Sequence, residues 1–189
     1  ADILKVRNYF EKNQHAVLNE FVSFLAIPNV TNDSANIRRN ADFIMNAMTQ
    51  RGIQNVQLLF PTTSKAFPSV YGEVMTPGAT QTIIFYAHYD GQPVIPSQWA
   101  KGLTPFTPVL TNESLEKGGS IINFPPSTIS YDLQNRIYAR GASDDKAGVM
   151  AILNAYDAIV KSGMKPTVNI KFFFEGEEES GSPSLIPFM

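Results

Sequence analysis

A cluster of carboxylates follows an apolar run near the end of the chain. The run Ile170 to Phe174 leads directly into residues 175–179, four of which are glutamates. Such a run predicts a strand, and open α/β folds build their sites where strands end. Neighbouring carboxylates repel one another, so we expect a cation among them, and hard or borderline metal ions are the usual candidates.

A second apolar run delivers a histidine and an aspartate. Thr82 to Ala87 predicts a strand, followed at once by His88 and, two residues on, by Asp90. In an extended backbone these two side chains project to the same side. That spacing suits a metal-bound imidazole whose orientation is fixed by a neighbouring carboxylate. Asp144 and Asp145, just ahead of a predicted helix, add further carboxylates.

Taken together, these segments resemble the dinuclear zinc exopeptidases and deacylases. This family includes carboxypeptidase G, succinyl-diaminopimelate desuccinylase, acetylornithine deacetylase, aminoacylase and the carnosinase-like dipeptidases, and the last branch looks most similar. Each matching piece is modest by itself, but their order and placement are specific. The matching pieces are His88 to Pro93, Trp99 with Pro105 and Phe106, Tyr138 to Lys146, and Glu175 to Ser182.

The resemblance implies a role for each site residue. His88 would bind one metal, Asp144 would bridge both, and Glu179 would bind the other. Glu178 would be the general base, and Asp90 would orient the His88 ring. The implied cofactor is a pair of Zn²⁺ ions, for which Co²⁺ or Mn²⁺ can substitute. The peptide bond that follows Asp144 is expected to be cis.

The implied activity is metal-dependent hydrolysis of amide or peptide bonds in small substrates, by a dipeptidase or exopeptidase. A deacylase or desuccinylase acting on N-acyl amino acids would use the same site, and the sequence does not choose between them. The non-enzymatic alternatives are an inactive fragment and a metal-binding or assembly module. A calcium-binding loop is less favoured, because it has no use for His88.

The chain departs from the family pattern in length. Family members continue into a lid domain and a C-terminal half, which carry a further acidic ligand and a late histidine. Residues 1–189 are therefore expected to be the N-terminal part of the catalytic domain. The stretch between Pro108 and Tyr131 indicates an insertion at about 109–131. The resemblance allows a homodimer for the full-length protein.

The amino-acid composition limits the classes of molecule that we expect the chain to bind. With 15 basic and 17 acidic residues the chain has no basic stripe, so nucleic acid is not an expected partner. No apolar run reaches the roughly 18 residues that a membrane span requires. Cysteine is absent, so any metal must be held by oxygen and imidazole. The expected compartment is cytoplasmic or, if Ala1 is a processed N-terminus, periplasmic or secreted.

Hydrophobic periodicity and breaker residues predict the elements that position these side chains. Their order predicts an α/β fold with a mixed, mostly parallel sheet and helices on both faces. Ser34 is the predicted N-cap of the second helix. The predicted helices are 3–25, 34–52 and 145–162, and the predicted strands are 56–60, 69–75, 82–87 and 168–174.

Overall fold

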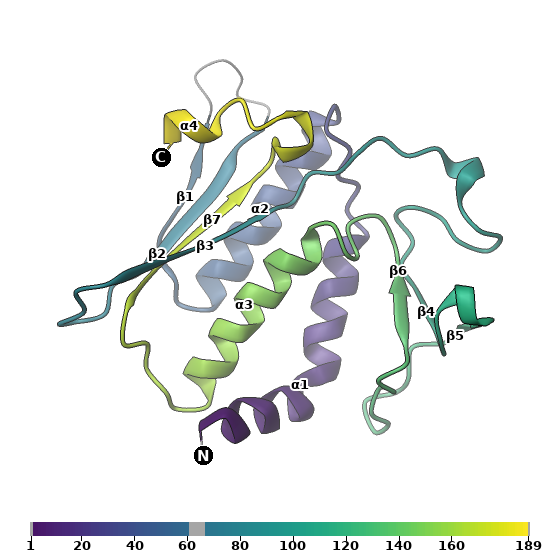
Figure 1. The fold of residues 1–189 in the computed structure, drawn as a ribbon, viewed down its shortest axis with the longest axis horizontal. Coiled ribbons are helices and arrows are strands. Elements are labelled where there is room, and N and C mark those ends of the chain that lie inside the picture. Colours follow the sequence, from purple (N-terminus) through teal and green to yellow (C-terminus); the bar gives the residue numbers. More distant parts are fainter. Residues whose placement is uncertain (1, 61–66, 189) are drawn as a thin grey trace.

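The computed structural model describes residues 2–60 and 67–188. Its main sheet has four strands in the order β1-β2-β7-β3 (Figure 1). These strands are β1 (Gln54–Leu59), β2 (Ser69–Val74), β3 (Thr82–His88) and β7 (Asn169–Glu175). The α-helices are α1 (Asp2–Leu25), α2 (Ser34–Gln50), α3 (Lys146–Lys161) and α4 (Leu185–Phe188).

The predicted mixed α/β class is confirmed, but the sheet is not mostly parallel. In the main sheet only β3 and β7 pair in parallel, whereas β1–β2 and β2–β7 are antiparallel. The connections between β1 and β2 and between β2 and β3 are too short for the crossover that parallel strands need. The path from β3 to β7 is long enough, and it contains α3.

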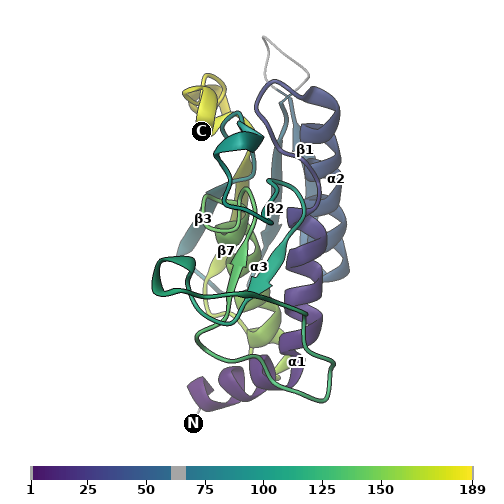
Figure 2. The same ribbon diagram turned by 90° about the vertical axis from the view of Figure 1, so that its right-hand side faces the viewer.

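The two faces of the main sheet are covered unequally. Val70, Phe172 and Phe174 share one face, where they join a core with buried residues of α2 and α3. α1 packs against α3, and the two helices lie side by side in Figure 1. On the other face Phe173 lies 6.3 Å from Phe188 of the short helix α4, measured between ring centroids. Figure 2 shows α2 and α4 on opposite sides of the strands, so helices on both faces are confirmed.

β3 is the outer strand of the main sheet in the described part of the chain. Four consecutive apolar or aromatic side chains on it are each 38% to 52% exposed. Because side chains alternate along a strand, these residues lie on both faces of the sheet. They are Ile83, Ile84, Phe85 and Tyr86.

The predicted N-cap of α2 is wrong by one residue. Asp33, not Ser34, caps this helix, because its Oδ1 accepts the backbone N–H of Asn36 at 3.1 Å. α3 begins in the same way, with the Asp145 carboxylate accepting the N–H of Gly148 at 3.1 Å. None of the described helices is long and apolar enough to cross a membrane.

Residues 109–131 contribute to a second, smaller antiparallel sheet. It has the order β5-β4-β6, with β4 at Val109–Thr111, β5 at Ile121–Ile122 and β6 at Arg136–Tyr138. None of these strands was predicted. Short 3₁₀-helices occur at Pro96–Gln98 (η1), Leu115–Lys117 (η2) and Glu178–Ser180 (η3). The interpretation of 109–131 as an insertion stays a prediction.

Candidate metal centre

The three predicted segments meet at one edge of the main sheet. His88 ends β3 and Glu175 ends β7, and the two residues are partners in the parallel register. Asp144 lies directly ahead of α3, the helix that connects these strands. Parallel strands end at the same edge of a sheet, so the topology brings the histidine and the acidic segments together.

The His88 ring lies between carboxylates. Its Nε2 is 3.0 Å from Oδ1 of Asp144 and 3.7 Å from Oε2 of Glu178. Zinc bonds of about 2 Å in tetrahedral geometry separate two donor atoms by roughly 3.3 Å. The donor types of His88 and Asp144 and their separation therefore fit two ligands of one metal, with Glu178 beside them. The predicted proximity of Asp144 and Glu178 to His88 is thus found, whereas the convergence of Glu179 with them and the roles of all these residues stay predictions.

Asp90 is fully buried beneath this site. Its Oδ1 lies 3.3 Å from Nδ1 of His88, as expected for a carboxylate that orients the ring. The same carboxylate accepts the backbone N–H groups of Glu178 at 3.2 Å and Glu179 at 3.0 Å. Asp90 therefore holds both the imidazole and the backbone that carries the acidic side chains.

Glu179 lies apart from the His88 ring. Its Oε2 accepts a hydrogen bond from Nε2 of Gln92 at 2.7 Å. Among the described residues, the carboxylates within 4.0 Å of the His88 ring nitrogens belong to Asp90, Asp144 and Glu178. The place of Glu179 on a second metal, the one that His88 does not bind, stays a prediction.

Within residues 2–60 and 67–188, no group of three or more histidine, aspartate or glutamate side chains is arranged to hold a metal ion by itself. The contacts that the structure does give centre on His88, which has two carboxylate oxygens facing Nε2. His88 and Asp144 suit a metal in donor type and separation, and further ligands would have to complete the site.

Asp145 links the end of β3 to the start of α3. Its Oδ2 accepts the backbone N–H of His88 at 3.3 Å, while its Oδ1 caps α3 through Gly148. The peptide bond between Asp144 and Asp145 is cis, which confirms the expectation from the family resemblance.

Lys146 anchors the other side of this junction. Its side chain is fully buried, and Nζ donates to the carbonyl oxygens of Phe24 at 2.8 Å and Ile27 at 2.7 Å. Burial lowers the pKa of Lys146 well below its usual value. From the sequence, Lys146 could be placed only in the first turn of a helix. Its two carbonyl partners lie more than a hundred residues away in the chain, so these hydrogen bonds could not be predicted.

The charges around His88 favour its protonated form in the metal-free protein. Burial acts to lower the pKa of His88, but the hydrogen bond and charge of Asp90 and the charges of Glu178 and Asp145 raise it to about 9. A metal ion at Nε2 would have to displace a proton, since only the neutral ring nitrogen is a ligand.

Two residues of this edge had no predicted role. The hydroxyl of Tyr86 donates to Oε2 of Glu175 at 2.6 Å, and Glu175 is only 1% exposed. Side chains two residues apart in a strand lie on the same face, so the position of Tyr86 two residues before His88 could have indicated that it lies near the site. Arg140, which lies within the matching segment Tyr138 to Lys146, donates to the carbonyl oxygen of Pro93 at 3.4 Å.

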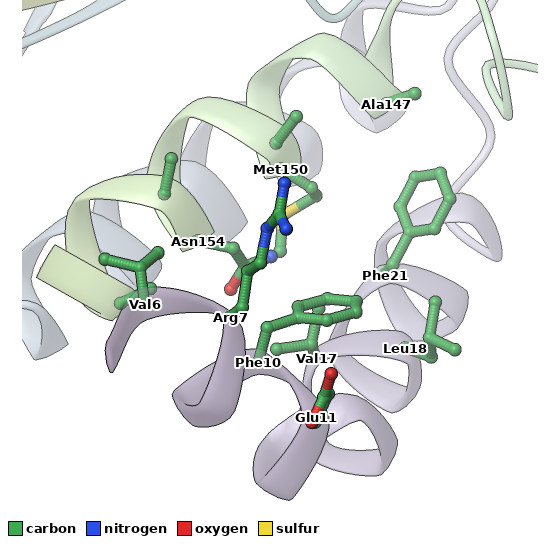
Figure 3. Close-up of a pocket in the computed structure, with 13 residues that line it drawn as sticks. Val6, Arg7, Phe10, Glu11, Val17, Leu18, Phe21, Ala147, Met150 and Asn154 are labelled. Atoms are coloured by element: carbon green, nitrogen blue, oxygen red, sulfur yellow. The ribbon is translucent and has the colours of Figure 1, made fainter. Parts of the chain in front are cut away.

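A separate apolar groove lies between α1 and α3 (Figure 3). Its volume is about 430 Å³, and Val6, Phe10, Phe21 and Met150 are among the residues that line it. None of the five predicted site residues lines this groove. The chemistry therefore belongs to the strand ends and not to the groove.

The chain is similar in sequence to known proteins. Residues 84–188, more than half of the chain, match the family model described as Peptidase family M20/M25/M40. The Cys-Gly metallodipeptidase of Candida albicans is 29% identical over 174 residues, which cover 85% of this chain and 31% of that protein.

Two solved structures are also similar. An M20 family metallo-carboxypeptidase from Sulfolobus solfataricus is 29% identical with a TM-score of 0.68, over 91% of this chain and 33% of that one. The di-peptidase Dug1p from Saccharomyces cerevisiae shares the fold, with a TM-score of 0.76 at 22% identity, over 98% of this chain and 36% of that one. The chain thus spans about a third of the length of the curated relatives it matches.

Proposed function

The chain belongs to peptidase family M20/M25/M40, and on this basis we propose that it contributes the first ligands and the general base of a zinc-dependent dipeptidase. Membership of this metallopeptidase family implies a metal cofactor. One observation of the structure carries the proposal. The Nε2 atom of His88 lies 3.0 Å from Asp144, a separation that suits two ligands of one metal, and the carboxylate of Glu178 lies beside them at 3.7 Å from Nε2.

The donor types favour zinc. His88 offers an imidazole nitrogen, and Asp144 and Glu179 offer carboxylate oxygens, a mixture that zinc accepts readily. Two zinc ions would polarise the scissile carbonyl and make water a better nucleophile when bound. His88 and Asp144 would hold one ion, and Asp144 and Glu179 the other.

Glu178 is the proposed general base. Its side chain is 42% exposed, so water and substrate can reach the carboxylate. It would take a proton from the attacking water and return it to the leaving amine. Asp90 keeps this glutamate in place through the backbone N–H of residue 178, and it keeps the His88 ring in place through Nδ1.

The proposed substrate is a dipeptide, with Cys-Gly as the first to test because of the relative from Candida albicans. The test uses a protein that carries this chain with the full length of its relatives. Zinc should support Cys-Gly hydrolysis, and both a chelator and His88→Ala should abolish it. Zinc-dependent cleavage of N-acyl amino acids but not of dipeptides would identify a deacylase instead. Absence of hydrolysis of either class in the zinc-loaded protein would overturn the proposal.

A further inference from the structure

Tyr86 contacts the first residue of the acidic turn, which we define as Glu175–Ser182. Its hydroxyl donates to Oε2 of Glu175 at 2.6 Å. We propose that Tyr86 is a positioning residue that holds the start of the acidic turn and so fixes the glutamates that follow. This inference rests on the proposed function for the metal role of those glutamates, but the anchoring of the turn is independent of it.

The Glu175 carboxylate depends on this contact. It is 1% exposed, and its Oε1 has no hydrogen-bond partner among the described residues. Tyr86 is therefore the donor that the structure gives to this carboxylate. A buried carboxylate without a donor is strongly unfavourable, so loss of the phenol hydroxyl would drive Glu175 toward water and shift the start of the acidic turn.

The rest of the acidic turn is held by its own backbone. Ser180 and Ser182 donate their N–H groups to the carbonyl of Glu177, and Gly181 donates to the carbonyl of Glu178. Asp90 accepts the two remaining amides of this segment, those of Glu178 and Glu179. Asp90 thus fixes the middle of the turn, and Tyr86 fixes its start. All five amides of residues 178–182 report on whether the turn keeps this conformation.

The hydroxyl and the ring of Tyr86 contact different residues. The ring stacks on Phe173, with centroids 6.3 Å apart and an interplanar angle of 14°. Phenylalanine at position 86 keeps this packing and removes only the hydroxyl. Tyr86→Phe is therefore a conservative variant that should fold.

Tyr71 provides a matched control. It is the register partner of Phe173 on β2, as Tyr86 is on β3. Its hydroxyl likewise donates to a glutamate, Oε2 of Glu73, at 2.7 Å. Tyr71→Phe removes a chemically equivalent hydrogen bond from the same sheet, and the contact it removes does not involve the acidic turn.

The experiment compares amide hydrogen exchange, followed by NMR, in the metal-free 189-residue chain and its two variants. Tyr86→Phe should speed exchange at residues 178–182 by roughly tenfold, the effect of losing one hydrogen bond to a charged group. Tyr71→Phe should leave these five amides unchanged. Equal exchange in Tyr86→Phe and the unsubstituted chain, or an equal change in both variants, would overturn the proposal.

A zinc titration against a competing chelator connects the turn to the metal. In a protein that carries this chain with the full length of its relatives, Tyr86→Phe should weaken zinc binding by roughly tenfold, the lower end of the effect of a partner outside the ligand set. Faster exchange with unchanged zinc affinity would overturn the link between the turn and the metal centre. If the unsubstituted full-length protein bound no zinc, the proposed function would fail, while the exchange result would still decide the role of Tyr86.

Discussion

The buried carboxylate of Asp90 accepts the backbone N–H of Glu179 at 3.0 Å. Oδ1 of the same carboxylate lies 3.3 Å from Nδ1 of His88, so one side chain connects the end of β3 to the acidic turn. The two-residue spacing from His88 indicated the first contact. The second joins residues 89 positions apart and depends on the fold.

Asp90→Asn should weaken zinc binding more than a loss of ring orientation alone. An amide has one acceptor atom and a donor NH₂ group, so it cannot accept both the Glu178 and Glu179 N–H groups through two oxygens. We expect zinc affinity to fall about 10- to 100-fold. A chelator competition titration measures this, with Asp42→Asn on the exposed face of α2 as the control. Equal affinity in the two variants would contradict the double role.

Adjacent glutamates should respond differently to loss of charge. In a protein with the full length of its relatives, Glu178→Gln should keep metal content nearly intact and reduce turnover by roughly 10²- to 10⁴-fold, the contribution of a positioned base. Glu179→Gln should lower metal content instead. Metal analysis and steady-state kinetics on both variants distinguish the roles. The reverse pattern would exchange the assignments, with Glu178, 3.7 Å from Nε2 of His88, as the ligand.

Lys146→Ala should destabilise the fold strongly. It leaves a cavity and removes the donor from the carbonyl oxygens of Phe24 and Ile27. We expect a loss of about 3 kcal/mol in the free energy of unfolding, and a smaller loss for Lys146→Met, which fills the space. Urea denaturation measures both. Lys161→Ala, at the exposed end of α3, is the control and should change stability by less than about 0.5 kcal/mol. A comparable loss at the two positions would disprove the anchoring role.

Asp33→Ala should destabilise α2 in a pH-dependent way. The hydrogen bonds from the side chain and backbone of Asn36 lower the pKa of Asp33 below its usual 3.8. A carboxyl group whose pKa is lower in the folded protein than in the unfolded protein stabilises the fold at pH values above its ordinary pKa. This stabilisation is lost as the pH falls through the pKa of the folded state. At pH 7 we expect a cost of about 1 kcal/mol, which shrinks in acid.

The control for the cap is Ser34→Ala, which removes the residue that the sequence favoured. Because the structure places the cap at Asp33, this change should cost much less at pH 7. Thermal unfolding of both variants between pH 7 and pH 3 provides the measurement. A larger loss for Ser34→Ala would restore the original assignment.

Much of the site-bearing framework could be predicted because its elements carry strong local signals. β3 is a continuous apolar run, β7 carries three consecutive phenylalanines, and the predicted helix 145–162 differs from α3 by one residue at each end. Their carboxyl ends had to meet at one edge, which placed His88 near the acidic segments. The strands β4, β5 and β6 are only two or three residues long, too short for alternation to be visible.

Contacts that depend on strand register could not be predicted. Tyr86 reaches Glu175 only because β3 and β7 pair in parallel with His88 opposite Glu175. The Lys146 contacts likewise require the end of α1 to lie against the start of α3. The family resemblance supplied roles for five residues, Asp90 among them, but it did not indicate that Asp90 and Tyr86 contact the acidic turn.

The position of β3 at the rim of the described sheet affects how the protein should behave in concentrated solution. A flat outer strand offers a row of unpaired backbone N–H and C=O groups, and here large apolar side chains flank that row on both faces. Another strand can add to such a rim, so the isolated chain should be prone to association and aggregation. Ile84 is 52% exposed, and its replacement by lysine should reduce this association. A charged side chain on an outer strand opposes pairing with a further strand.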